Sequence, residues 1–159
     1  MSRPSLRIER IEGPDWWRLV CTWIRQTHRH RHHPPPVGWL WGYAVWRGSK
    51  LVAVATVGRP VARAFKGRLE LTRVCSIGNG ASWGACSLIY RTAAVGGVTL
   101  TYTLDSEPGT SLRADGWVPV ARVRGRDWAA CDRRKGPQQL LAPWEHQPAK
   151  VNKIRWEPA

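Results

Sequence analysis

The stretch that most constrains the fold is LTYTLDSEPGTSLRADGW, residues 100–117, which joins a strand pattern, an acidic loop and a short helix pattern without interruption. Apolar side chains alternate with threonines over residues 100–104, and this period of two predicts a strand. Pro108 and Gly109 then interrupt the pattern, and a short helix is predicted over residues 110–116. The acidic loop therefore follows directly on the carboxyl end of a strand, where ligands of α/β proteins usually bind.

The acidic loop and the strand before it supply the candidate catalytic residues, which are Tyr102, Asp105, Ser106 and Glu107. A carboxylate at this position could act as a general base toward an amine, a role that requires reach and a tuned pKa. An ordinary acidic turn would place the same residue types there. Position alone leaves both interpretations open.

The chain is expected to form one domain, since 159 residues can bury a core without disulfides or metals. We expect a folded domain over residues 1–124 and an irregular, basic C-terminal extension over residues 125–159. The sequence has no run of roughly 18 apolar residues and no apolar leader, which predicts no membrane contact and a cytoplasmic location. Its four cysteines form no CxxC pair, so free thiols are predicted.

The charge of the chain indicates an anionic partner. A formal net charge of +14 at pH 7 creates a field that attracts polyanions, so double-stranded DNA is the expected partner. A GC-rich genome would explain the preference for arginine over lysine, but it does not so easily explain the shortage of acids. The residues expected to contact backbone phosphates or, for the tryptophans, an extruded base are Arg59, Arg63, Lys66, Arg68, Arg73, Trp39 and Trp41.

The order of the predicted elements indicates an α/β (α+β) fold. They run strand, helix, hairpin, strand, glycine-rich loop with helix, strand, helix, strand, which gives a mixed sheet of about six strands flanked by helices. This order resembles the fold of the GNAT acyltransferases. The resemblance implies an acyl-CoA donor whose pyrophosphate lies on the loop after the fourth strand, where the expected contacts are Gly78, Asn79, Gly80 and Ser87. The glycines stand at a different spacing from the usual GNAT pattern, and another anionic donor would fit equally.

Six segments in the same order resemble a narrower group, the small phage and bacterial proteins related to Mom. The segments are HHPPPVG, VGRPVAR, LELTRVC, ACSLIY, the stretch at residues 100–117, and KIRWE. The resemblance implies transfer of a carbamoylmethyl (acetamido) group to N6 of adenine in DNA, which protects the DNA from restriction, with iron as a suspected cofactor.

An iron site of the two-histidine, one-carboxylate type needs converging imidazoles and a carboxylate. The candidate ligands are His32 and His33 with Asp105. A solvated basic stretch that touches phosphates is the alternative interpretation of the histidines.

Two other functions remain open on the sequence. One is an ordinary GNAT N-acetyltransferase that uses acetyl-CoA on an amine of a small molecule, a tRNA or a protein. The other is a basic module that binds nucleic acid without catalysis. A homodimer is compatible with each of them.

Overall fold

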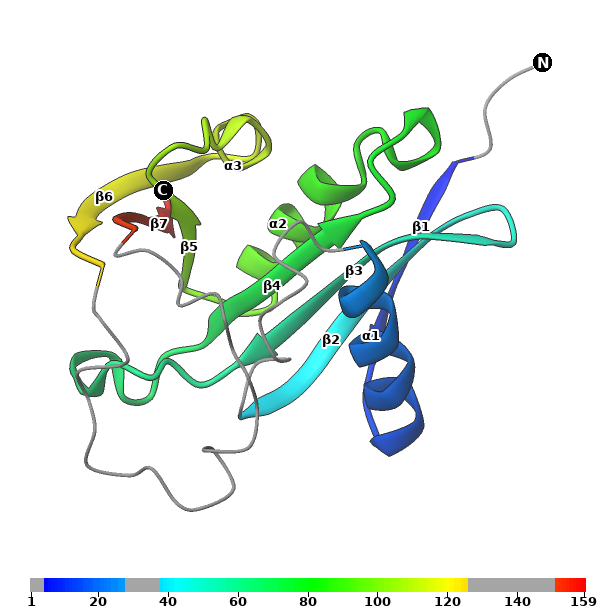
Figure 1. Cartoon of the computed structure of the whole chain (residues 1–159), viewed down its shortest axis with the longest axis horizontal. Helices are drawn as coiled ribbons and strands as arrows, with labels where there is room; N and C mark the ends of the chain where they lie inside the picture. The colour runs from blue at the N-terminus through cyan, green and yellow to red at the C-terminus, as the bar shows by residue number, and fades with distance from the viewer. Residues whose placement is uncertain (1–4, 28–37, 126–150) are drawn as a thin grey trace, which may run out of the picture.

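The computed structural model describes residues 5–27, 38–125 and 151–159, which form one mixed seven-stranded sheet flanked by helices (Figure 1). Neighbouring strands follow the order β1-β2-β3-β4-β5-β7-β6. The strands are β1 (Leu6–Ile11), β2 (Trp39–Arg47), β3 (Lys50–Gly58), β4 (Glu70–Ser76), β5 (Leu100–Leu104), β6 (Trp117–Val123) and β7 (Lys153–Pro158). The helices are α1 (Pro14–Thr27), α2 (Ala85–Val95) and α3 (Thr110–Ala114), with 3-10 turns η1 (Arg63–Phe65) and η2 (Gly80–Ser82). The predicted α/β class is confirmed.

Strands β1 to β4 pair antiparallel in chain order, and β2 and β3 form the predicted hairpin. The hairpin between β2 and β3 turns at Gly48, whose φ of 60° lies in the left-handed region that favours glycine. Strands β4 and β5 are parallel, and α2 joins them because parallel neighbours need a crossover connection. The crossover brings the predicted acidic loop to the sheet directly after β5.

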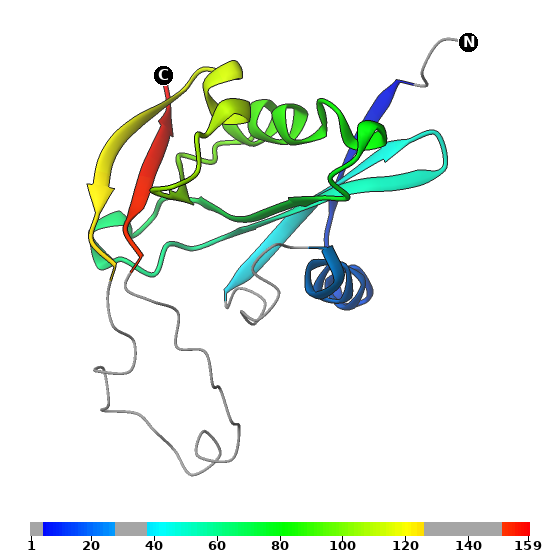
Figure 2. The same ribbon diagram turned by 45° about the horizontal axis from the view of Figure 1, so that its top comes forward.

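The helices cover both faces of the sheet (Figure 2). Helices α2 and α3 lie on one face, where Ile89, Leu112 and Trp156 belong to the larger buried cluster. Helix α1 lies on the opposite face, against β3 and β4, and buries Val20 and Ile24. Within the described ranges, no helix is long and apolar enough to span a bilayer. We call these two surfaces the α2 face and the α1 face of the sheet.

The C-terminal extension differs from the prediction. Lys153–Pro158 forms β7, which lies between β5 and β6, so the prediction of an irregular tail is wrong for this segment and the sheet has seven strands instead of about six. Ile154 and Trp156 alternate here with charged residues, a strand pattern that the surrounding prolines and charges obscured. Trp156 is 1% exposed and belongs to the core. Residues 126–150 of the extension lie outside the described residues.

Candidate active site

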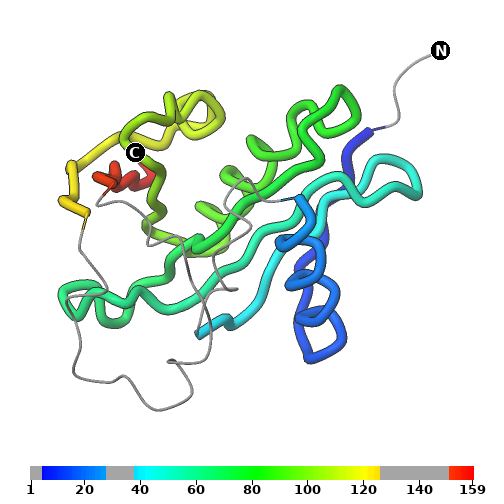
Figure 3. The backbone as a smooth tube through the Cα atoms, in the orientation of Figure 1, coloured from blue at the N-terminus to red at the C-terminus, as the bar shows by residue number. Residues whose placement is uncertain are grey.

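The parallel strands β4 and β5 separate soon after they meet, which opens a wedge in the middle of the sheet (Figure 3). Their ladder contains two residue pairs, Glu70 with Leu100 and Leu71 with Thr101. Beyond these pairs β4 continues beside β3, while β5 continues beside β7. The facing edges of the two strands therefore have no strand between them in the described part of the chain, and an extended ligand could pair with their backbone groups.

A bulge in β4 coincides with the start of the wedge. Leu71 pairs with Val57 of β3 and Arg73 pairs with Thr56, so Thr72 is an extra residue in β4. A bulge bends its strand and increases the local twist, and this one follows immediately on the last β4–β5 pair. The Thr72 hydroxyl donates to the carbonyl oxygen of Thr56 at 3.1 Å, which holds the bulge in place. We infer that the bulge turns β4 away from β5.

Glu70, the first residue of β4, stands at the narrow end of the wedge. Burial raises the pKa of its carboxyl to about 7, and the positive charges of Lys153 and Arg73 only partly oppose the shift. A carboxyl with a pKa near 7 is about half ionised at neutral pH, which suits it to accept a proton during a reaction. Glu70 is therefore the strongest candidate for a general base among the described residues.

Tyr102 lies on the same face of the sheet as Glu70, because Glu70 pairs with Leu100 and alternate residues of a strand share a face. Burial, followed by the negative charge of Glu70, raises the pKa of the Tyr102 hydroxyl above its ordinary value, so the group stays protonated at neutral pH. Across the β5–β7 pair Tyr102 faces Arg155, whose guanidinium lies 4.7 Å from the ring centroid of Phe65. The structure thus places one of the predicted catalytic residues beside Glu70.

The acidic loop after β5 makes contacts of its own at the open end of the wedge. Asp105 forms an ion pair with Arg122 of β6. Glu107 accepts a hydrogen bond of 3.1 Å from the backbone N–H of Leu104 and thereby closes the turn. Ser106 is exposed. The contacts of the two carboxylates are those of an ordinary acidic turn, and their catalytic role stays a prediction.

The described residues do not fit an iron site. No group of three or more His, Cys, Asp or Glu side chains within them could hold a metal ion. The predicted ligand Asp105 is paired with a cation, and His32 and His33 lie outside the described residues. Around Asp105 the described chain therefore offers no donor set for iron.

The glycine-rich loop and the start of α2 follow β4 at the open end of the wedge. The predicted donor contacts Gly78, Asn79 and Gly80 are exposed in the loop, and Ser87 lies in the first turn of α2. The Asn79 side chain accepts a hydrogen bond of 3.0 Å from the backbone N–H of Ala81, which holds the turn. The first helical hydrogen bond runs from the N–H of Leu88 to the carbonyl of Gly84. The backbone N–H groups ahead of it are the donors that an anion would meet.

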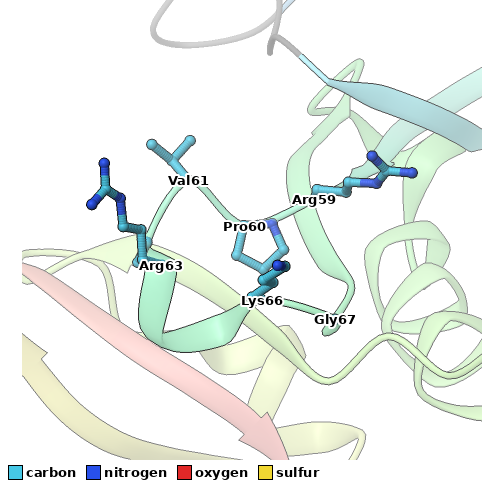
Figure 4. A pocket seen from close by; sticks show the side chains of 7 residues that line it. Arg59, Pro60, Val61, Arg63, Lys66 and Gly67 are labelled. Atoms are coloured by element: carbon cyan, nitrogen blue, oxygen red, sulfur yellow. The ribbon is translucent and has the colours of Figure 1, made fainter.

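Three of the predicted phosphate contacts surround an open hollow in the loop between β3 and β4 (Figure 4). Arg59, Arg63 and Lys66 are exposed there, around a space of about 410 Å³. Arg59 and Arg63 point to opposite sides of the loop, and Lys66 lies between them (Figure 4). Because these cations do not converge on one point, they fit a polyanion with several charges better than a single small anion.

Arg68 and Arg73, the other two predicted phosphate contacts, are engaged within the protein. Arg68 donates to the carbonyl oxygen of Thr99 at 2.7 Å and forms an ion pair of 3.0 Å with Glu157. Arg73 is half-buried, donates to the carbonyl oxygen of Thr72 at 2.9 Å, and has a guanidinium pKa lowered by burial. Arg68 therefore connects the loop before β4 to the segment before β5 and to β7, whereas Arg73 bonds within its own strand.

Trp39 and Trp41 are half-buried at the start of β2. Trp39 stacks on Trp17 of α1, with ring centroids 4.8 Å apart, and the guanidinium of Arg10 lies 4.2 Å from the ring centroid of Trp41. The indole Nε1 atoms of both residues are buried and have no hydrogen-bond partner among the described residues. The protein covers part of each ring, and base stacking on them stays a prediction.

Comparison with known proteins defines the class of fold. The chain matches no protein-family model, and no curated protein matches its sequence. It is similar to the ribosomal-protein-S18-alanine N-acetyltransferase from Escherichia coli, with a TM-score of 0.56 and 10% identity over 97% of this chain and 93% of that one. It is also similar to Arabidopsis thaliana NAA60 in complex with acetyl-CoA, with a TM-score of 0.60 and 6% identity over 96% of this chain and 98% of that one.

A third similar structure is the acetyltransferase of GNAT family from Streptococcus pneumoniae, with a TM-score of 0.59 and 10% identity over 96% of this chain and 97% of that one. The fold is therefore that of the GNAT acetyltransferases, as the order of elements predicts. At these identities the likeness defines the fold. The Mom-related group finds no support in the comparisons.

The sequence patterns did not single out Glu70 as a functional residue. The sequence feature that distinguishes Glu70 is that it is the one acid among eight cations between Arg47 and Arg91. A lone acid in such a segment can neutralise neighbouring charges or serve a reaction. Only the strand pairing, which places Glu70 at the narrow end of the wedge, separates the two interpretations.

Proposed function

We propose that the protein is an N-acyltransferase that moves an acyl group from an acyl-CoA thioester to an amine. The observation that carries the proposal is the Glu70 carboxyl, whose pKa is raised to about 7 at the narrow end of the wedge. The fold supports it, since the similar Arabidopsis structure is a complex with acetyl-CoA. The acyl-CoA supplies an activated acyl group as a thioester.

The wedge fits an extended donor such as acyl-CoA. The amide groups of a pantetheine arm could pair with the β4 edge after Leu71, where β5 has moved away. The pyrophosphate would then reach the exposed loop at residues 78–80 and the first turn of α2, including the backbone N–H of Ser87. The donor would thus run from the loop toward Glu70.

The reaction needs two proton transfers. As the amine nitrogen attacks the thioester carbonyl carbon, the C–N bond forms, the C–S bond breaks, the nitrogen loses a proton and the sulfur leaves as a thiolate. Glu70 is suited to take the proton from nitrogen, directly or through a water molecule. Tyr102, which its raised pKa keeps protonated, is suited to supply a proton to the sulfur.

A labelled-transfer assay tests the proposal. The full chain is incubated with radiolabelled acetyl-CoA and four acceptor classes: small amines, N-terminal peptides, tRNA and duplex DNA. We expect one class to become labelled, and Glu70→Gln to lower kcat by about 10²- to 10⁴-fold. The matched control is Asp15→Asn, which removes an exposed acid on α1 and should leave the rate unchanged. No labelled acceptor in any class from folded protein would contradict the proposal.

The basic hollow favours a nucleic acid as the carrier of the amine, as in Mom-type modification of N6 of adenine. Arg59, Arg63 and Lys66 are exposed on the loop that leads into β4. Lys66 and Glu70 are four residues apart, so their backbone separation is at most about 14 Å. A phosphate held by the hollow would therefore lie within reach of a base at Glu70.

Nucleoside mass spectrometry of DNA and RNA from cells that express the protein tests this second candidate. We expect an adenine adduct in DNA that is missing in cells with Glu70→Gln. A carbamoylmethyl adduct would require a donor other than acetyl-CoA, because an acetyl group holds no amide nitrogen, and its mass distinguishes the two. An adduct confined to RNA would overturn the DNA assignment and leave the acyltransferase in place.

A further inference from the structure

Arg47, the last residue of β2, binds the glycine-rich loop that precedes α2. Its Nε donates to the carbonyl oxygen of Ala81 at 2.6 Å, and its Nη2 donates to the carbonyl oxygen of Trp83 at 2.9 Å. A guanidinium is planar and holds its donors in a fixed fork. One side chain of β2 therefore fixes two peptide groups of the loop that joins β4 to α2.

The orientation of the second peptide group determines what an anion would meet. In a trans peptide the C=O and the N–H point in opposite directions, and the described residues contain no cis peptide bond. Because the carbonyl of Trp83 points toward the Arg47 guanidinium, the N–H of Gly84 points away from it. Gly84 also accepts the first helical hydrogen bond of α2, from Leu88 at 2.9 Å. Its N–H thus begins the row of helix-initial donors.

The charge of Arg47, like the orientation of the Gly84 N–H, favours the binding of an anion at the start of α2. Carbonyl oxygens carry partial negative charge, and two of them turned toward the open end of the wedge would repel a pyrophosphate. Bound to the guanidinium, both oxygens are turned toward a cation, and the positive charge adds to the positive end of the α2 dipole. Without Arg47 the loop would lose both its fixed orientation and part of its positive potential.

We propose that Arg47 is a positioning residue for the donor, which aims the backbone N–H groups at the start of α2 toward the pyrophosphate of acyl-CoA. The inference rests on the proposed acyl-CoA site. It assigns Arg47 a role in binding the nucleotide half of the donor and none in the proton transfers at Glu70.

Three variants of the full chain test the proposal. Arg47→Met removes the fork and the charge, and Arg47→Lys keeps the charge but cannot hold two carbonyls in one plane. The matched control is Lys50→Met, since Lys50 is exposed and stands opposite Arg47 in the β2–β3 register. It removes the same charge from the same hairpin. Isothermal titration calorimetry then gives the Kd of CoA and of pantetheine, which lacks the pyrophosphate.

Arg47→Met is expected to weaken CoA binding by about 10- to 30-fold and Arg47→Lys by less, because a hydrogen bond from a charged group contributes on that scale. Lys50→Met should stay within about twofold of the wild type. The Kd of pantetheine should be the same in all four proteins. In the transfer assay the KM for acyl-CoA should rise in the Arg47 variants while kcat stays within about twofold.

The outcomes separate this inference from the proposed function. A wild-type protein that does not bind CoA overturns both. A wild-type protein that binds CoA, with Arg47 variants that bind it equally well, overturns only the role of Arg47. Equal losses in Arg47→Met and Lys50→Met, or an equal loss for pantetheine, would also overturn it. Melting temperatures check folding, and the folded Arg47→Lys protein decides the question if Arg47→Met does not fold.

Discussion

Thr101 donates a hydrogen bond from Oγ1 to the carbonyl oxygen of Leu71 at 2.8 Å, at the point where β4 and β5 separate. The two residues form the last pair of the β4–β5 ladder, and Thr101 is 4% exposed. A side chain therefore reinforces the backbone pairing where that pairing ends. The bond closes the narrow end of the wedge beside Glu70.

Removing that bond should destabilise the fold. Thr101→Val keeps the shape of the side chain but loses the buried donor, and we expect the free energy of unfolding to fall by about 1 to 2 kcal/mol in urea titrations. The control is Thr22→Val, because Thr22 bonds to a carbonyl on the exposed side of α1. It should change stability by no more than about 0.5 kcal/mol. Equal effects of the two variants would mean that the Thr101 bond has no special role.

Glu70 should destabilise the folded state as the pH rises. Its pKa is about 7 in the folded protein against an ordinary 4.5, so the folded state binds more protons between these values. The stability that comes from the protonated Glu70 carboxyl is complete below about pH 4.5 and is lost as the pH rises through about 7. Glu70→Gln should therefore match the wild type at low pH and exceed its stability above neutrality by up to about 3 kcal/mol.

Urea titrations at about pH 4.5 and about pH 8 check this stability prediction. Asp15→Asn again serves as the control, because Asp15 is exposed on the first turn of α1. A Glu70→Gln protein that is less stable than the wild type at the higher pH would show that the charged carboxylate is stabilised by Lys153 and Arg73 after all.

The same carboxyl should control the pH dependence of transfer. As Glu70 ionises, the base becomes available, so kcat/KM should rise with an apparent pKa of about 7. The residual activity of Glu70→Gln should lack this rise, apart from any change that comes from the acceptor amine. A wild-type profile that stays flat from about pH 6 to about pH 8 would exclude Glu70 as the base.

Gly109, before α3, should tolerate no side chain. Its φ is 62°, and an added Cβ would lie 2.4 Å from Cζ2 of Trp156, which is buried in β7. Gly109→Ala should lower the free energy of unfolding by about 2 to 4 kcal/mol. In Gly97→Ala, where φ is 83° and no heavy atom lies within 4 Å of the added Cβ, about 1 kcal/mol is expected. Similar costs for both would contradict the packing of β7 against α3.

An arginine that is bonded within the protein and an exposed arginine of the hollow should respond differently to substitution. Arg68→Met loses bonds to Thr99 and Glu157 and should lower stability by about 1.5 to 3 kcal/mol, with little effect on binding of duplex DNA. Arg63→Met removes an exposed cation and should leave stability unchanged, while the salt dependence of DNA binding falls by about one unit of slope. Melting curves and filter binding at several salt concentrations check both. A loss of stability in Arg63→Met, with the lower salt dependence of DNA binding in Arg68→Met instead, would contradict the proposed role of the hollow in DNA binding.

Local patterns predict the first six strands and the three helices well, because each of these elements carries its own periodicity. The helix that the element order predicts after the glycine-rich loop forms over Ala85–Val95. Strand β7 escaped prediction because Lys153–Pro158 pairs with β5 and β6 across a long stretch of sequence. Its alternation is visible in Ile154 and Trp156, but only the long-range pairing makes a short strand of this kind stable.

The site was predictable only in part. The glycine-rich loop and Tyr102 lie where the strand order places them, at the wedge. Glu70 could not be found from sequence, since its raised pKa comes from burial in the folded sheet. There it pairs with Leu100 of β5, thirty residues further along the chain. Arg47 was equally hidden, because its contacts with the loop join segments more than thirty residues apart.

Hydrogen exchange of the full chain with and without acetyl-CoA measures directly whether the wedge binds the donor. If the wedge binds the donor, saturating acetyl-CoA should slow exchange in peptides that cover residues 72–76 of β4 and residues 84–88 at the start of α2. Peptides of α1 (Pro14–Thr27), which lies on the opposite face of the sheet from α2, should be unchanged and serve as the internal control. Protection that is missing from β4, or confined to another part of the sheet, would mean that the donor does not bind in the wedge.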